Sequence, residues 1–182
     1  MAAADGAFRR KQGVVMALGL AAALIVLAVG AHARDWFAGL VPSADDLATR
    51  LAFALRWLLA PGLMLLAGIQ VAASRGFHSD AIDGTRAPKS HYLEITLRYN
   101  QNTLEQTVLA AIAWLGLAVM MSHAALAFIP AMAGLFVAGR VTFWVGYLVY
   151  PTARAFGMVL TGLPTIGAYG WLVVDAFSGR QG

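Results

Sequence analysis

The sequence predicts an all-α integral membrane protein. Of its 182 residues, 60% are hydrophobic and only 12% are charged, and the mean hydropathy is +0.70. Soluble domains carry about 25% charged residues, so this chain has too few charges to cover a surface that faces water. Five apolar stretches, each close to the ~20 residues that cross a hydrocarbon core, occupy most of its length.

Each apolar stretch is predicted to be a transmembrane helix, because backbone polar groups cannot stay unpaired in lipid. The strands of a membrane β-barrel would be about half as long and would alternate in polarity. The stretches cover residues 13–33, 51–73, 104–122, 128–150 and 156–177.

The first stretch has two interpretations. It follows the basic residues Arg9, Arg10 and Lys11 and ends in Ala31-His32-Ala33, which is also the layout of a secretory signal peptide with a small-residue cleavage site. The apolar run is long for a signal peptide, so we favour a retained span and keep cleavage as the alternative. We divide the chain into an N-terminal segment, residues 1–42, and a main membrane domain, residues 43–182.

Local patterns define the second helix. Ser43 followed by Asp46 resembles a capping arrangement, which predicts a helix that starts near Ala44. Pro61 lies inside the apolar run, and a proline at such a position kinks a transmembrane helix.

The distribution of charge predicts the topology. Basic residues precede the first span, occupy the 74–98 connection and recur at Arg154, whereas those on the opposite side are accompanied by aspartates. The positive-inside rule then places the N-terminus and the 74–98 loop in the cytoplasm and the C-terminus outside. In a bacterial cell the membrane would be the inner (plasma) membrane.

Other functions lack support in the composition. The chain has no cysteine, which excludes disulfides, thiolate metal sites and a protein thiol nucleophile, and we predict no metal site. The net charge of +4 comes from scattered residues without a binding motif, so no nucleic-acid partner is predicted.

The entry to the third span carries a polar face. Arg98, Asn102 and Glu105 are spaced by four and three residues, so they share one side of a helix. A carboxylate at the membrane boundary needs a partner, which Arg98 or an arginine of another helix could supply. The alternative is a hydrogen-bonded clamp between helices, but three different polar groups on one face favour a ligand site.

The fourth span ends in a second polar pattern. Arg140, Tyr147 and Arg154 are seven residues apart, about two helical turns, so Arg140 and Tyr147 should face the same way. Pro151 should end or bend the helix before Arg154. The alternatives are arginines that extend to the headgroups and, for Tyr147 and Trp144, an aromatic belt.

The candidate site residues all map to the cytoplasmic ends of four spans, where a bundle would bring them together. Several arginines and one carboxylate suit an anionic ligand that also carries an ammonium group, such as a zwitterionic peptide with two carboxylates. These residues are Arg75, Arg98, Asn102, Glu105, Arg140, Tyr147 and Arg154.

These motifs resemble the MAPEG superfamily, the membrane-associated proteins in eicosanoid and glutathione metabolism. The run RYNQNTLEQ (98–106) is similar to the family's Arg-Asn-Glu pattern at a helix start. The run GRVTFWVGYLVYPTAR (139–154) is similar to a later pattern of the leukotriene-conjugating synthase branch. The likeness covers about residues 51–177 and looks like a bacterial-type member with an extra N-terminal hydrophobic segment.

The resemblance implies a four-helix transmembrane bundle, plus the extra N-terminal helix, that assembles as a homotrimer with glutathione as cosubstrate between protomers. It implies Arg75, Arg98 and Arg140 near the peptide's carboxylates or backbone, Asn102 and Tyr147 as hydrogen-bond partners, and Glu105 on its amine. Arg154 would lie near the sulfur, where a cation lowers the pKa of the thiol and favours the reactive thiolate. A lipophilic electrophile would approach from the bilayer.

The sequence departs from the synthase pattern at three positions. Gln106 and Phe143 stand where that branch has tyrosines, and Gly76 stands where it has a second arginine. These changes argue against leukotriene chemistry and allow looser glutathione binding.

The sequence therefore favours a membrane-embedded glutathione-dependent transferase or peroxidase that acts on lipophilic electrophiles. The alternative is a non-enzymatic lipid-binding or scaffold protein of the same fold, as in the lipoxygenase-activating branch. A small transporter or channel is disfavoured, because its polar groups would lie near the middle of the bilayer rather than at one end.

Overall fold

The computed structural model describes residues 2–83 and 88–178, which form helices and no strand. The α-helices are α1 (Ala2–His32), α2 (Leu47–Trp57), α3 (Leu59–Ala73), α4 (His91–Met120), α5 (Phe128–Val149) and α6 (Arg154–Phe177). Short 3-10 helices occupy Ala33–Leu40, Ser74–Phe77 and His123–Ala127.

Five helical segments of the described chain are long and apolar enough to cross a membrane, which confirms the all-α membrane fold. They are Arg10–His32, Leu47–Phe77, His91–Met120, His123–Val149 and Arg154–Phe177.

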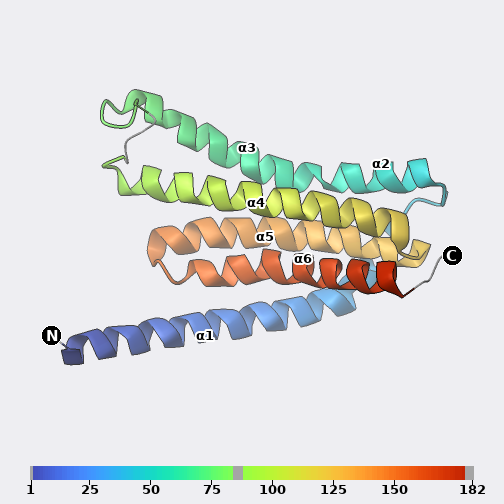
Figure 1. Ribbon diagram of the computed structural model, residues 1–182, viewed down its shortest axis with the longest axis horizontal. Coiled ribbons are helices and arrows are strands. Elements are labelled where there is room, and N and C mark those ends of the chain that lie inside the picture. The colour runs from blue at the N-terminus through green and yellow to red at the C-terminus, as the bar shows by residue number, and fades with distance from the viewer. Residues whose placement is uncertain (1, 84–87, 179–182) are drawn as a thin grey trace.

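The helices lie side by side along one direction (Figure 1). Helices α2 and α3 follow each other along one side of α4, helices α5 and α6 pack closely together, and α1 packs chiefly against α6. The N-terminus, the α3–α4 connection and the α5–α6 connection lie at one end, which we call the N-terminal end of the bundle.

The second span is broken into α2 and α3, as Pro61 predicted. The helical pattern is interrupted at Leu58, three residues before the proline. Pro61 has no N–H to donate to the carbonyl of Trp57, and its ring crowds that carbonyl. The helix therefore changes direction at this point.

The start of α2 differs from the prediction. Asp46 is the N-cap, and its carboxylate accepts hydrogen bonds from the Thr49 amide at 3.0 Å and the Thr49 hydroxyl at 2.6 Å. The predicted Ser43 cap with a helix from Ala44 is wrong, because residues 43–45 are not helical. The bonds from Thr49 hold the pKa of the Asp46 carboxyl below its ordinary value.

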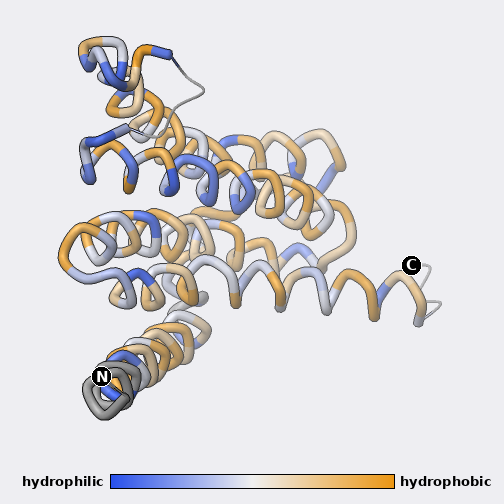
Figure 2. The backbone as a smooth tube through the Cα atoms, turned by 60° about the vertical axis from the view of Figure 1, so that its left-hand side comes forward, coloured by the Kyte–Doolittle hydropathy of each residue, from blue (hydrophilic) through white to orange (hydrophobic). Residues whose placement is uncertain are grey.

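Helix α4 begins well before the predicted apolar stretch. Ser90 caps it by accepting a hydrogen bond from the Leu93 amide, and the helix has 30 residues. At about 1.5 Å per residue it is longer than the ~30 Å hydrocarbon core, so it extends beyond the core. Figure 2 places hydrophilic residues on its first turns, at the N-terminal end of the bundle.

The core lies between α2, α4, α5 and α6. Trp114 of α4 and Phe136 of α5 meet edge to face with ring centroids 6.4 Å apart, and both are almost fully buried. Small residues such as Ala110 and Ala113 let the helix backbones approach, which is how transmembrane helices gain packing energy without a hydrophobic driving force.

Arg50 of α2 holds the far end of α4, so the Arg50→Ala variant should be less stable. Its guanidinium donates to the carbonyl oxygens of Ala118, at 2.6 Å, and of Met121, and it pairs with Asp45 at 3.1 Å. These carbonyls have no partner within the helix. We expect a loss of about 2 kcal/mol, typical of hydrogen bonds to charged groups, in unfolding of the purified protein in detergent.

The matched control is Arg56→Ala, an exposed arginine later in the same helix. Equal stability of the two variants would show that Arg50 does not cap α4.

Candidate functional site

A polar groove lies at the N-terminal end of the bundle, between α4, α5 and α6. It has a volume of about 290 Å³. Five of the seven predicted site residues line it, together with three others. The lining residues are Arg98, Gln101, Asn102 and Glu105 of α4, Phe143 and Tyr147 of α5, and Arg154 and Met158 of α6.

The face of α4 that contains Arg98, Asn102 and Glu105 forms one wall, as the spacing predicted. Arg98 pairs with Glu94 at 2.9 Å rather than with Glu105. The Glu105 carboxylate accepts a hydrogen bond from the Gln101 amide at 2.9 Å, and within the described residues it forms no ion pair. Its negative charge is therefore available to a cationic group in the groove.

Arg154 opens α6 on the opposite wall. Its guanidinium carbon lies 4.5 Å from the centre of the Tyr147 ring, a cation–π distance, and the side chain is exposed. The first backbone N–H groups of α6 add partial positive charge at the same place. Pro151 lies between the end of α5 at Val149 and this start, so the predicted helix end is confirmed.

Arg140 lies beneath the groove and does not line it. The residue is fully buried and joins three helices. Its guanidinium donates to the Asn102 amide oxygen at 2.7 Å, the Thr161 hydroxyl at 2.5 Å and the Gly157 carbonyl at 3.4 Å. It is therefore not an arginine that extends to the headgroups.

The bond from Arg140 fixes the orientation of Asn102. A guanidinium has only donors, so only the amide oxygen of Asn102 can face it. The amide N–H₂ is then directed away from Arg140, on a residue that lines the groove. Asn102 can thus offer donors to a carboxylate or a peptide carbonyl.

Aromatic residues pack next to Arg140, and one of them, Phe143, also lines the groove. The Phe143 ring centre lies 4.8 Å from the Arg140 guanidinium carbon. Trp144 stacks on Tyr99 with ring centroids 4.7 Å apart, and Tyr99 donates to the Met64 carbonyl of α3. Trp144 is thus half-buried against Tyr99 rather than fully exposed to lipid.

Arg75 lies apart from the groove. It is in the short helix Ser74–Phe77 that follows α3, and its Nε donates to the Ala81 carbonyl oxygen at 2.9 Å. The structure of one chain thus brings six of the predicted residues together, five on the groove wall and Arg140 behind it, and leaves Arg75 in the α3–α4 connection.

Two groove residues were missed by the sequence analysis. Gln101 lies three residues after Arg98 and four before Glu105, so the same helical spacing identifies it. Met158 lies four residues after Arg154, one turn further along α6. Its apolar side chain carries no chemical pattern that would distinguish it from other lipid-facing residues.

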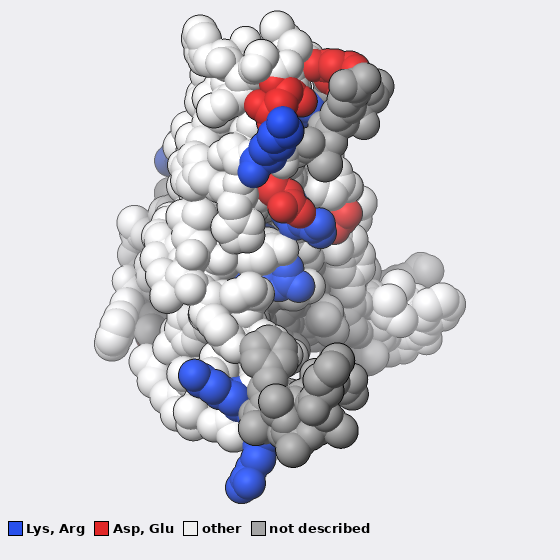
Figure 3. Space-filling model, turned by 90° about the vertical axis from the view of Figure 1, so that its left-hand side faces the viewer, with Lys and Arg blue, Asp and Glu red and all other residues white. Residues whose placement is uncertain are grey.

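The end of the bundle that carries the groove has basic and acidic side chains next to one another (Figure 3). Near the groove, Arg98 pairs with Glu94 of the same helix at 2.9 Å. A ligand with both signs of charge would find partners there.

The fold and the groove define a helical membrane protein with a charged site at one end of its spans. A scan against protein families matches residues 51–174 to the MAPEG family, and the chain belongs to that family. Searches of curated proteins and of solved structures each found no match. The matched residues run from α2 to α6 and exclude α1, and membership supports, in general terms, a function like that of membrane glutathione transferases or related to it.

Proposed function

We propose that the protein is a membrane-embedded glutathione-dependent transferase or peroxidase that acts on lipophilic electrophiles. The observation that carries this proposal is the groove in which Arg98, Asn102 and Glu105 of α4 face Tyr147 and Arg154. Arginine, amide and carboxylate groups of this kind complement the two carboxylates, the peptide bonds and the single ammonium group of glutathione.

Each charge of the tripeptide has a partner in the groove. Glu105, which forms no ion pair within the described residues, would bind the ammonium group. Arg98 and the outward N–H₂ of Asn102 would bind carboxylate or peptide oxygens, and charge-assisted hydrogen bonds of this type are the strong ones. Arg140 contributes by holding Asn102 at 2.7 Å, which makes it a positioning residue rather than a ligand.

Arg154 would favour the reactive form of the sulfur. A guanidinium near a thiol lowers its pKa, and the N-terminus of α6 acts in the same direction. The thiolate then attacks an electrophilic carbon, a C–S bond forms and the leaving group departs with its electron pair. With a hydroperoxide the thiolate attacks oxygen and the O–O bond breaks, and a second glutathione completes the reduction to alcohol, water and glutathione disulfide.

The electrophile would reach the thiolate from the lipid. Met158 lines the groove and is 46% exposed, and α5 carries exposed apolar residues such as Val141 and Val145. A lipophilic molecule dissolved in the bilayer can therefore approach the sulfur while glutathione enters from the aqueous side.

The proposed assembly is the homotrimer that the family resemblance implies. Arg75 lies outside the groove of its own chain, so in this proposal it would reach glutathione only in the groove of a neighbouring protomer. The same proposal places the N-terminus and the groove on the cytoplasmic side, because the basic connections lie at this end.

The Arg154→Ala variant should bind glutathione but fail to ionise it. We expect the ultraviolet absorbance of the thiolate, strong in the wild-type protein at saturating glutathione, to be lost at neutral pH. The pH profile of conjugation should move upward by about one unit or more, the usual effect of removing a nearby opposite charge. In the wild-type protein Arg154 would lower the pKa of the thiol of bound glutathione. The variant should therefore lose most of its activity at low pH, where its glutathione stays protonated.

Arg154→Lys is the matched control, since it keeps the charge and should retain part of the thiolate absorbance. An absence of thiolate absorbance in the wild-type protein would overturn the proposed chemistry. It would favour the second candidate, a lipid-binding or scaffold protein.

A further inference from the structure

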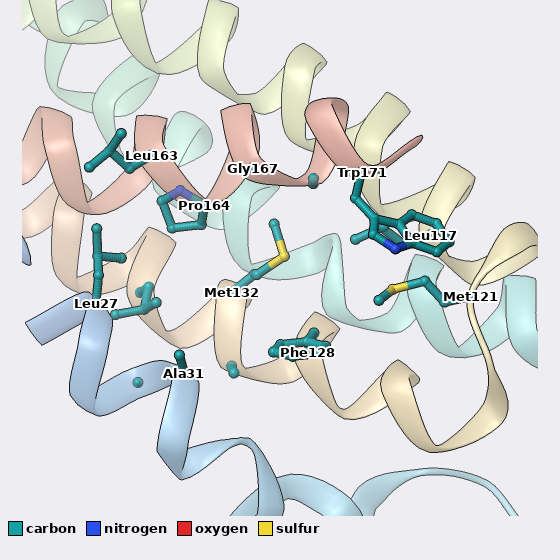
Figure 4. Close-up of a pocket in the computed structure, with 14 residues that line it drawn as sticks. Leu27, Ala31, Leu117, Met121, Phe128, Met132, Leu163, Pro164, Gly167 and Trp171 are labelled. Atoms are coloured by element: carbon teal, nitrogen blue, oxygen red, sulfur yellow. The ribbon is translucent and has the colours of Figure 1, made fainter. Parts of the chain in front are cut away.

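A second cavity lies between α1 and the helices α4, α5 and α6 of the family domain, by which we mean the matched residues 51–174 (Figure 4). It lies toward the end of the bundle opposite the groove. Its volume is about 390 Å³, within the range of about 300–1,000 Å³ that is usual for ligand pockets. Four helices supply its walls. They include Ala31 of α1, Leu117 of α4, Met121 directly after α4, Met132 of α5, and Gly167 and Trp171 of α6.

The walls are apolar and adaptable. None of the described residues that line the cavity is charged. Met121 and Met132 carry flexible thioethers, which adjust to irregular apolar shapes. At Gly167 a side chain would meet no atom within 4 Å, so the glycine leaves space that another residue would fill. The cavity therefore suits a flexible hydrocarbon.

The position of the cavity within the membrane-spanning helices favours a hydrocarbon chain as its occupant. Its walls belong to the membrane-spanning parts of α1, α5 and α6, and they continue into apolar side chains on the lipid-facing surface, such as Val29 (59% exposed) and Ile166 (66% exposed). Water would be unfavourable there, because a buried water needs two to four polar partners. An unoccupied void would also forfeit the van der Waals contacts of its lining, whereas hydrocarbon chains are present at the same depth.

Trp171 marks one end of the cavity (Figure 4). It is 36% exposed and lies in the last turns of α6. Tryptophan is typical of the depth of the lipid headgroups, where its ring meets hydrocarbon and its N–H meets polar groups. Its indole N–H is a donor suited to the ester carbonyl at the head of a lipid chain.

We propose that this cavity holds one acyl chain of a membrane phospholipid, which fills the space between α1 and α6 and attaches α1 to the family domain. The site is distinct from the polar groove, since Arg154 and Gly167 are separated by roughly 20 Å along α6. The proposal does not depend on glutathione chemistry. Because the walls carry no charge, recognition rests on the chain and not on the headgroup.

A photoreactive lipid tests this proposal. The full chain is reconstituted in vesicles of phosphatidylethanolamine and phosphatidylglycerol that contain a phospholipid with a diazirine in one acyl chain, and labelled peptides are mapped after irradiation. We expect labels to concentrate on buried cavity residues such as Met132 and Leu117 rather than on exposed residues such as Val173. Moving the probe from one headgroup to the other should leave the labelling unchanged.

Filling the cavity should displace the chain. The Gly167→Leu variant should lower cavity labelling about tenfold, and Ala31→Leu should do the same from the α1 side. Gly170→Leu is the matched control, because it makes the same change in α6 at an exposed position that does not line the cavity and has no atom within 4 Å. Each variant is first required to elute from size-exclusion chromatography like the wild-type protein.

Three results would overturn the proposal. The first is an even distribution of labels over the lipid-facing surface. Alternatively, Gly167→Leu and Ala31→Leu, whichever of them folds, could be labelled in the cavity as strongly as Gly170→Leu. Labelling that follows the headgroup would also contradict recognition through the chain. Glutathione-dependent thiolate absorbance should remain unchanged in both cavity variants, so failure here is distinguishable from failure of the proposed enzyme.

Discussion

The Gly157→Ala variant is expected to lose the packing of α5 against α6 and to unfold readily. An added methyl carbon would overlap the Gly139 carbonyl oxygen and the Phe143 backbone nitrogen. Both contacts are to backbone, so no side-chain rotation can relieve them. Overpacking costs about 1–3 kcal/mol where side chains can adjust, and we expect about 3 kcal/mol or more here, measured as loss of stability in detergent.

The same change at Gly162 is the control. Gly162 is in the same helix, and an added methyl carbon there meets no atom within 4 Å. Gly162→Ala should be neutral or should gain up to about 1 kcal/mol from the better helix propensity of alanine. If Gly157→Ala were as stable as Gly162→Ala, the close approach of α5 and α6 at Gly139 would be incorrect.

Much of the fold could be predicted because a membrane imposes its own requirements on a sequence. The length of each apolar run and the break caused by Pro61 follow from the bilayer thickness and from the missing N–H of proline. The true start of α4 could not be obtained in this way. Residues 91–103 are too polar for a span, and they are helical because Ser90 caps them and because Leu93, Ile95 and Tyr99 are buried against the bundle.

Helical spacing within α4 and α5 was enough to predict most residues of the candidate site. It could not predict which of them line the groove and which are buried or lie elsewhere. Spacing places Arg98, Asn102 and Glu105 on one face and cannot show which partner each will choose. Arg98 takes Glu94 of its own helix. The exclusion of Arg75 and the burial of Arg140 depend on how separate helices pack, which a pattern along a single helix does not contain.

The Arg140→Met variant is expected to fold almost normally and to bind glutathione weakly. Arg140 is fully buried, and no described carboxylate pairs with it. A buried charge without a counter-ion is costly. Methionine would also leave no orphaned partner in α6, because the Thr161 hydroxyl already donates to the Gly157 carbonyl at 3.2 Å. We therefore expect unfolding stability within about 1 kcal/mol of wild type.

Glutathione affinity should fall by about 10- to 100-fold, because the lost bond to Asn102 is charge-assisted and such bonds contribute about 1.5–3 kcal/mol. Without it the Asn102 amide is free to turn its oxygen toward the groove and repel a carboxylate. Calorimetric titration with glutathione, alongside thermal unfolding, separates the two effects. Exposed Arg56→Met is the control for lost charge, and Asn102→Asp should keep the fold through a new pair with Arg140 yet lose the amide donors. An Arg140→Met protein that unfolds instead would make Arg140 a clamp between helices. The buried charge of Arg140 would then serve to stabilise the bundle and not to position Asn102 for glutathione.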